Sequence, residues 1–88
     1  MQKKTIVLNS SDNVASALVD LGKGDEVTVR IPQGGTQTIT LTQAIQLGHK
    51  FALTDIMSGA EVTKLGMPLG VATRDIQVGE HVHVHNVR

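Results

Sequence analysis

Glycine and proline interrupt this chain so often that long regular elements have little room to form. Nine glycines and two prolines are spread over 88 residues, and Val, Ile and Thr together account for 26 positions. β-Branched residues favour strands, whereas glycine and proline mark the turns between them. The sequence therefore predicts a mainly β fold of short strands, and its length predicts a single domain spanning residues 1–88.

The strongest strand signal is a hairpin. Residues 26–31 and 36–42 alternate apolar and polar side chains, and Pro32 to Gly35 form a turn between them. Val27, Val29 and Ile31 are expected on one face of the first strand. Further strands are expected at residues 5–8, 50–55, 61–63, 69–73 and 80–87.

One short helix is expected near the N-terminus. Apolar residues there recur at i, i+3, i+4 and i+7, residues that commonly cap helices precede them, and a glycine follows. The capping residues are Ser11 and Asp12, the apolar stripe is Val14, Ala17, Leu18 and Leu21, and the glycine is Gly22.

A Gly-x-x-Val step recurs along the chain. It begins at Gly24, Gly59 and Gly79, and Asp55 and Asp75 precede the last two copies at the same spacing. Each copy is interpreted as a turn glycine with positive φ followed by a strand with an inward valine. The two aspartates are expected to accept hydrogen bonds in turns rather than to act in catalysis.

Charge and composition exclude several functions. Eight basic and eight acidic residues balance, and Phe51 is the single aromatic residue. Neither an electrostatic footprint for nucleic acid or membranes nor a stacking surface for bases is present. The chain has no cysteine, and neither a membrane span nor a signal peptide is recognisable. A soluble cytoplasmic domain is expected, whose small core favours burial against a partner or a second copy.

Three histidines near the C-terminus are the most informative feature. His81, His83 and His85 alternate with valines, so a strand would project all three imidazoles from one face. Two imidazoles at i and i+2 can bind one metal ion, and His49 or a carboxylate could complete the site. The alternatives are a face turned toward a partner or an active site, and a merely polar strand face.

A second polar group precedes the strand of Phe51. Gly48 is followed by His49 and Lys50, which places two donor groups at the tip of a turn. Such a tip could bind a carboxylate substrate or transfer a proton. A solvated turn without such a role is the alternative.

Several motifs together resemble the altronate dehydratase family, which includes galactarate dehydratase. The resemblance extends over essentially the whole chain. The motifs are Asp12-Asn13-Val14-Ala15, Gly48-His49-Lys50-Phe51-Ala52-Leu53-Thr54-Asp55-Ile56, Gly59-Ala60, Lys64-Leu65-Gly66-Met67-Pro68-Leu69-Gly70, Asp75-Ile76 and Gly79-Glu80-His81-Val82-His83-Val84-His85-Asn86.

The resemblance implies a SAF domain, a β-clip fold of short bent strands, joined in this family to a much larger catalytic domain or subunit. The implied reaction is the loss of water from D-altronate to give 2-dehydro-3-deoxy-D-gluconate, a step of hexuronate catabolism, with Fe²⁺ or Mn²⁺ in the complete enzyme. The chain would be inactive alone. The expected catalytic residues are His49, Lys50, His83 and His85, and the expected metal ligands are His81, His83 and His85.

Two alternatives accompany this hypothesis. The chain could be the small subunit of a related lyase, since a sulfolactate sulfo-lyase has a small subunit with similar histidine motifs, and galactarate is a third substrate to consider. It could also be a non-catalytic module that binds sugar acids or assembles with a large subunit.

Overall fold

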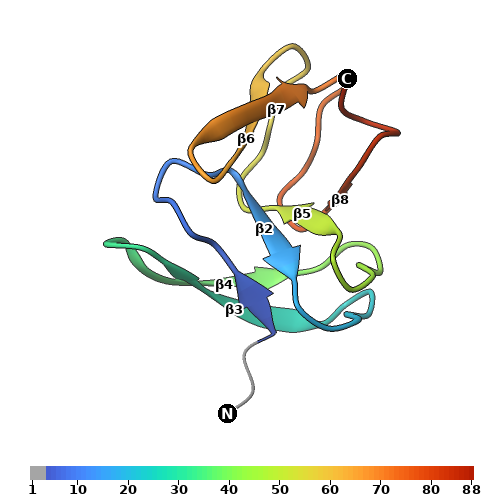
Figure 1. The fold of residues 1–88 in the computed structure, drawn as a ribbon. Helices are drawn as coiled ribbons and strands as arrows, with labels where there is room; N and C mark the ends of the chain where they lie inside the picture. The colour runs from blue at the N-terminus through green and yellow to red at the C-terminus, as the bar shows by residue number, and fades with distance from the viewer. Residues whose placement is uncertain (1–3) are drawn as a thin grey trace.

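Eight short strands and no helix make up residues 4–88, the part of the chain that the computed structural model describes (Figure 1). The predicted mainly β fold is confirmed. The strands are β1 (Thr5–Ile6), β2 (Val14–Ala17), β3 (Glu26–Ile31), β4 (Gly35–Thr40), β5 (Lys50–Ala52), β6 (Glu61–Lys64), β7 (Met67–Val71) and β8 (His81–Val82).

A central antiparallel sheet lies between two hairpins. Its strand order is β1-β2-β5-β8, while β3 pairs with β4 and β6 pairs with β7. In Figure 1 the β3–β4 hairpin lies below β2 and β5, and the β6–β7 hairpin lies above them. Side chains alternate across a sheet, so Ala15 and Phe51 join the core between the central sheet and the β3–β4 hairpin, while Val14 and Ala52 join the core shared with β6. The central sheet is therefore buried on both faces.

The predicted hairpin is confirmed, both in its position along the chain and in the side chains that point toward the core. β3 and β4 pair from Glu26↔Thr40 to Ile31↔Gly35. Val27 and Val29 are buried, and Ile39 contacts the same core from β4. Alternation with one polar face is the sequence pattern that a half-exposed strand produces.

The predicted helix is wrong. Residues 14–17 form β2, and all four of its side chains are buried. A strand that is buried on both faces and built from small residues shows no alternation, so the helical spacing there was fortuitous. Asp12 does not cap a helix; its carboxylate accepts hydrogen bonds from the backbone N–H groups of Leu65 and Gly66, both at 2.9 Å.

The glycine turns are confirmed, and the structure shows a fourth copy. Each turn glycine has φ between 85° and 88°. The N–H of the residue that follows the glycine donates a hydrogen bond to the carbonyl of the residue two positions before the glycine. The four glycines are Gly24, Gly48, Gly59 and Gly79. The fourth copy, at Gly48, has Phe51 where the others have valine, which hid it from the Gly-x-x-Val pattern. The turns associate in pairs through the bridges Leu21↔Ile45 and Ile56↔Ile76.

The two turn aspartates act as predicted. Asp55 Oδ1 accepts a hydrogen bond from the N–H of Val78, at 3.0 Å, and Asp75 Oδ1 accepts one from the N–H of Ser58, at 2.8 Å. Each carboxylate therefore holds the turn of the other copy. This exchange of contacts fastens the second pair of turns together.

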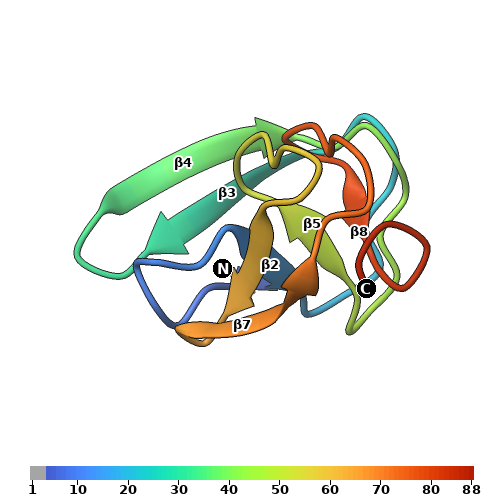
Figure 2. The ribbon, with the colours of Figure 1, turned by 90° about the horizontal axis from the view of Figure 1, so that it is seen from above.

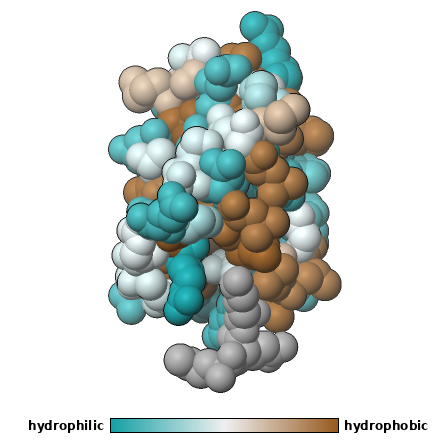
Figure 3. Space-filling model, turned by 60° about the vertical axis from the view of Figure 1, so that its left-hand side comes forward, coloured by the Kyte–Doolittle hydropathy of each residue, from teal (hydrophilic) through white to brown (hydrophobic). Residues whose placement is uncertain are grey.

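Several large apolar side chains remain exposed. Figure 3 shows hydrophobic residues gathered in a band on one face of the molecule. Among residues 4–88, no helix is long and apolar enough to cross a membrane. At the tip of the β6–β7 hairpin, Leu65 is 53% exposed and has φ of 56°. The exposed residues are Leu8, Leu18, Leu47, Met57, Leu65, Met67, Leu69, Val78 and Val84.

Candidate functional site

Pairing of β5 with β8 brings the histidines of two distant segments together. Phe51 pairs with His81 and Lys50 pairs with Val82. His49 directly precedes β5, in the turn that Gly48 makes with positive φ. Figure 2 shows β8 beside β5, followed by the C-terminal turn in red. The fold thus places His49, which is 32 residues away in sequence, next to His81.

The imidazole rings of four histidines lie close together with nearly parallel planes. His49 Nδ1 lies 2.9 Å from His81 Nε2, so one of these nitrogens donates a hydrogen bond to the other. The ring of His49 also stacks on that of His83, with centroids 4.4 Å apart and planes 12° apart. His85 stacks on His81 at 5.2 Å. All four histidines singled out in the sequence therefore belong to one cluster.

Three of these residues converge closely enough to share one ion. One ring nitrogen from each of His49, His81 and His83 lies within 4.8 Å of the other two. His85 is exposed and lies outside this close group. The expected ligand row of His81, His83 and His85 thus differs from the close group in one member, and a metal role for His85 stays a prediction.

The predicted strand over residues 80–87 is too long, and its early end creates the cluster. β8 stops at Val82, and the chain bends at residue 83 and turns over residues 84–86. The ring centroids of His81 and His83 are 5.6 Å apart, whereas residues two apart on a regular strand are separated by about 7 Å. The bend also turns His83 onto His49.

Two residues that the sequence analysis gave no role hold this bend. Asn86 is fully buried; its Oδ1 accepts from the N–H of His83, at 3.0 Å, and its Nδ2 donates to the carbonyl of His81, at 2.9 Å. Gln43 Oε1 accepts from the N–H of His81, at 2.9 Å. Asn86 was visible only as the end of the histidine motif, and no sequence signal marked Gln43.

Electrostatics favour the neutral form of two imidazoles in the cluster, those of His81 and His83. Burial lowers the pKa of His81, and the positive charges of His85, His49, His83 and Lys50 lower it further. The pKa of His83 is lowered by burial and then by His49, Lys50 and His85. Within residues 4–88, the one ion pair joins Arg74 to Glu80, so no carboxylate is paired with the cluster. Neutral rings keep a lone pair available for a proton or a metal ion.

Lys50 lies beside the cluster but on the other face of β5. It pairs with Ser16 on one side and with Val82 on the other, and cross-strand neighbours share a face. Burial lowers the pKa of Lys50, as does the nearby charge of Lys64. Ser16 Oγ is buried and has no hydrogen-bond partner in the described chain. The predicted tip of His49 and Lys50 is therefore split between two faces, although the Lys50 charge still acts on His81 and His83.

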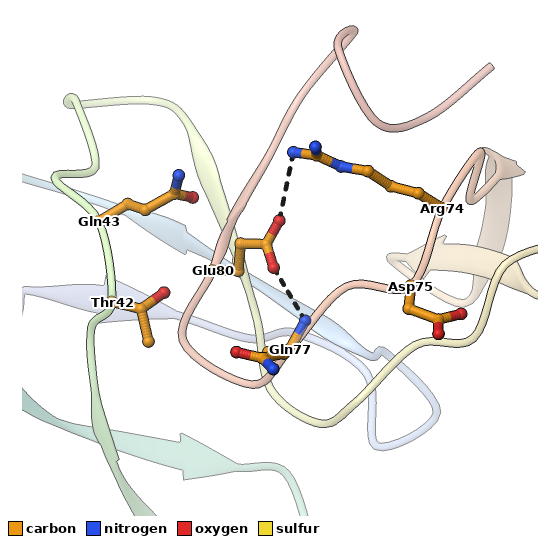
Figure 4. A pocket seen from close by; sticks show the side chains of 6 residues that line it. All are labelled: Thr42, Gln43, Arg74, Asp75, Gln77 and Glu80. Carbon is orange, nitrogen blue, oxygen red and sulfur yellow. Dashed lines mark hydrogen bonds and ion pairs between the residues drawn. The ribbon is translucent and has the colours of Figure 1, made fainter.

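An open polar pocket adjoins the histidine segment. Figure 4 shows Thr42 and Gln43 on one side of it, with Arg74 and Glu80 across from them. The Arg74 guanidinium lies 3.5 Å from Glu80, which also accepts from the N–H of Gln77, at 3.0 Å. Gln43 links this pocket to the cluster because it holds the backbone of His81.

Comparison with known proteins assigns a family to this arrangement. The family described as "Altronate/galactarate dehydratase SAF domain" matches residues 3–88. An altronate dehydratase of Escherichia coli (strain K12) is 53% identical over 94% of the chain, and one of Bacillus subtilis (strain 168) is 40% identical over 98%. The chain spans only 16% of the length of each of these two enzymes.

A smaller relative matches a shorter part of the chain. The (2R)-sulfolactate sulfo-lyase subunit alpha of Chromohalobacter salexigens is 39% identical over 64% of the chain, and the match covers 60% of that subunit. The two kinds of relative agree with the predicted resemblance. The chain belongs to the SAF-domain family of the altronate and galactarate dehydratases.

Proposed function

We propose that this chain is the SAF component of a lyase that removes water from D-altronate to give 2-dehydro-3-deoxy-D-gluconate. The histidine cluster carries this proposal, because it gathers proton-transfer groups at the surface of a domain whose core is aliphatic apart from Phe51. The chain spans a small part of the dehydratases that it matches. The remaining catalytic groups would come from a large domain or subunit in the same cytoplasmic complex, so the chain alone would be inactive.

The chemistry of the reaction suits the residues of the cluster. A base takes the proton from the carbon next to the carboxylate, the hydroxyl on the following carbon leaves as water, and the enol becomes a ketone. His85, whose ring lies against that of His81, would transfer these protons, and His83 would be a ligand of the metal ion proposed below. His49 would orient His83, and the Lys50 ammonium would attract the carboxylate of the sugar acid. The polar pocket beside Gln43 offers hydrogen bonds to its hydroxyls.

A divalent metal ion, Fe²⁺ or Mn²⁺, is proposed for the complete enzyme. The donor set fits Fe²⁺, because His49, His81 and His83 offer converging imidazole nitrogens, which iron accepts. When bound, the ion would polarise an oxygen of the substrate as a Lewis acid. Within this chain, the histidines would hold the ion.

The large partner would cover part of the exposed apolar surface. Leu65 at the tip of the β6–β7 hairpin is held in a left-handed conformation by the carboxylate of Asp12. Leucine is unfavourable in this conformation, and a large exposed apolar side chain gains little in water. Burial of this tip against the partner, or against a second copy of the chain, would account for both features.

A second candidate function is the small subunit of a related lyase, such as a (2R)-sulfolactate sulfo-lyase or a galactarate dehydratase. The observation in its favour is that one relative, a sulfo-lyase, is itself called a subunit and is matched over 60% of its length. A non-catalytic module that binds sugar acids is the remaining possibility, which the experiment below distinguishes.

The test is a chimera in which this chain replaces the matching segment of the Escherichia coli altronate dehydratase. The chimera should convert altronate with Fe²⁺ or Mn²⁺, and His83→Ala should lower kcat by about 10²-fold or more, because it removes a ligand of the metal ion that the reaction needs. Val84→Ala is the matched control, since Val84 is 82% exposed on the neighbouring position. Full activity of the His83→Ala chimera would show that the cluster is structural and would favour the non-catalytic module.

A further inference from the structure

We propose that His49, His81 and His83 form a three-histidine site that binds one divalent transition-metal ion within this chain alone. The site leaves a coordination position open for an oxygen ligand from outside the chain. The binding itself depends only on the geometry described here. The proposed function enters in one respect, since it names the sugar acid or the large partner as the source of that outside ligand.

The distances between the ring nitrogens suit such a site after small movements. Zinc–nitrogen bonds of about 2.0–2.1 Å with tetrahedral angles hold two ligand nitrogens about 3.4 Å apart. His49 Nδ1 and His81 Nε2 are 2.9 Å apart, and the three ring nitrogens lie within 4.8 Å of one another. On binding, the distance between His49 Nδ1 and His81 Nε2 would increase by about half an ångström. The ring nitrogen of His83 would move toward these two atoms by about 1.4 Å at most.

The hydrogen bond between His49 and His81 is the arrangement expected before an ion binds. It requires one ring to donate an N–H and the other to accept with a lone pair. If that ring carries its proton on its other nitrogen instead, both facing nitrogens have lone pairs directed at the same space. A metal ion would therefore take the place of the shared proton, which stays on the same ring as the imidazole changes tautomer.

The backbone that carries the ligands is held independently of any ion. The pairing of Phe51 with His81 fixes β8 against β5. Gln43 holds the N–H of His81, and the buried side chain of Asn86 holds both His81 and His83. Ligands that are positioned by outer hydrogen bonds lose less freedom on binding, and such outer contacts raise metal affinity.

The donor set indicates the chemistry of the ion and of the missing ligand. Three imidazoles suit Zn²⁺, Fe²⁺, Co²⁺ and similar ions, and three protein ligands with an open position are typical of catalytic sites. No carboxylate joins the close group, so all of its ligands are neutral. An ion bound there would keep its full positive charge and would attract an anionic oxygen, such as the carboxylate of a sugar acid.

The test is a titration of the 88-residue chain, stripped of metal with EDTA and dialysed. Calorimetry with Zn²⁺ and visible absorption with Co²⁺ should both show one ion per chain at pH 7.5. Absence of binding of either ion at micromolar concentrations would overturn the proposal.

Variants identify the ligands. His49→Gln, His81→Gln and His83→Gln should each weaken binding by about 10²-fold or more, whereas His85→Gln should change it by less than about threefold. Each variant is first checked for the wild-type thermal transition, so that loss of the fold is recognised. If His85→Gln weakened metal binding as much as His81→Gln and His83→Gln, and His49→Gln did not weaken it, the ligands would be His81, His83 and His85. That result would overturn the proposed ligand set.

The titration and the chimera experiment can fail separately. A chain that binds Zn²⁺ and Co²⁺ but gives an inactive chimera would support the site and contradict the proposed reaction. A chain that binds neither ion but gives an active chimera dependent on His83 would support the reaction and overturn the site.

Discussion

Gly79 makes the closest backbone approach among the four glycine turns. A Cβ at this position would collide with the carbonyl oxygen of Thr40, whereas a Cβ at Gly59 would meet nothing within 4 Å. Both glycines have nearly the same positive φ, 85° and 88°. The two positions therefore separate backbone strain from steric collision.

Gly79→Ala should lower the free energy of unfolding by more than about 3 kcal/mol, because strain and collision act together. Gly59→Ala should lower it by about 1 kcal/mol, from strain alone. Urea denaturation of both variants measures the difference. Equal losses in the two variants would contradict the close contact between the Gly79 turn and the end of β4.

Asn86 acts on the cluster through the backbone and is a positioning residue. Asn86→Ala should remove both of its hydrogen bonds, lower the free energy of unfolding by about 2 kcal/mol and weaken Co²⁺ binding by about 10-fold or more.

The matched control for Asn86 is Asn13, which makes the same kind of double contact, to Glu61 and Thr63, away from the histidines. Asn13→Ala should lower stability and leave Co²⁺ affinity unchanged. Affinities measured by visible absorption decide between the two, and an unchanged affinity in Asn86→Ala would contradict its positioning role.

At the scale of the elements, the turns depend on carboxylates from other turns. Asp75→Ala should cost about 1 kcal/mol of stability, because it removes the acceptor of the Ser58 N–H. Asp75→Asn keeps an acceptor oxygen and should recover most of the loss. Thermal unfolding of the two variants checks this, and a loss in Asp75→Asn as large as that in Asp75→Ala would contradict an acceptor role.

Elements with local signals could be predicted from the sequence. The β3–β4 hairpin alternates apolar and polar residues because one face is exposed, and the turn glycines reveal themselves because few other residues adopt positive φ. β2 could not be predicted, because both of its faces are buried and its burial is decided by partners distant in sequence.

The candidate site was predictable in its residue types and only partly in its geometry. The histidines stood out in the sequence, but the bend at His83 depends on the buried amide of Asn86, and the approach of His49 depends on β5 pairing with β8. Both are tertiary contacts, which no local pattern encodes.

At the scale of the whole molecule, the cluster makes stability depend on pH. The pKa values of His81 and His83 are lower in the folded chain than the unperturbed value of about 6.5. At pH values between the folded pKa values and about 6.5, the unfolded chain therefore binds more protons than the folded chain. The contribution of these histidines to stability is fully present above about pH 6.5 and is lost as the pH falls below it. Urea denaturation of the metal-free chain between pH 8 and 5 should show this fall, and His83→Gln should show a smaller one. A free energy of unfolding that increases as the pH is lowered from 8 to 5 would contradict the lowered pKa values of His81 and His83.

The central claim is that this domain completes the active site of a larger lyase. The most direct measurement adds the 88-residue chain to an Escherichia coli altronate dehydratase that lacks the matching segment, and follows the dehydration of altronate. The shortened enzyme alone should show little activity, addition of the chain should give saturable recovery, and the His83→Ala chain should give no recovery. Full activity of the shortened enzyme without the chain would show that this domain is not needed for the reaction, contrary to the proposal.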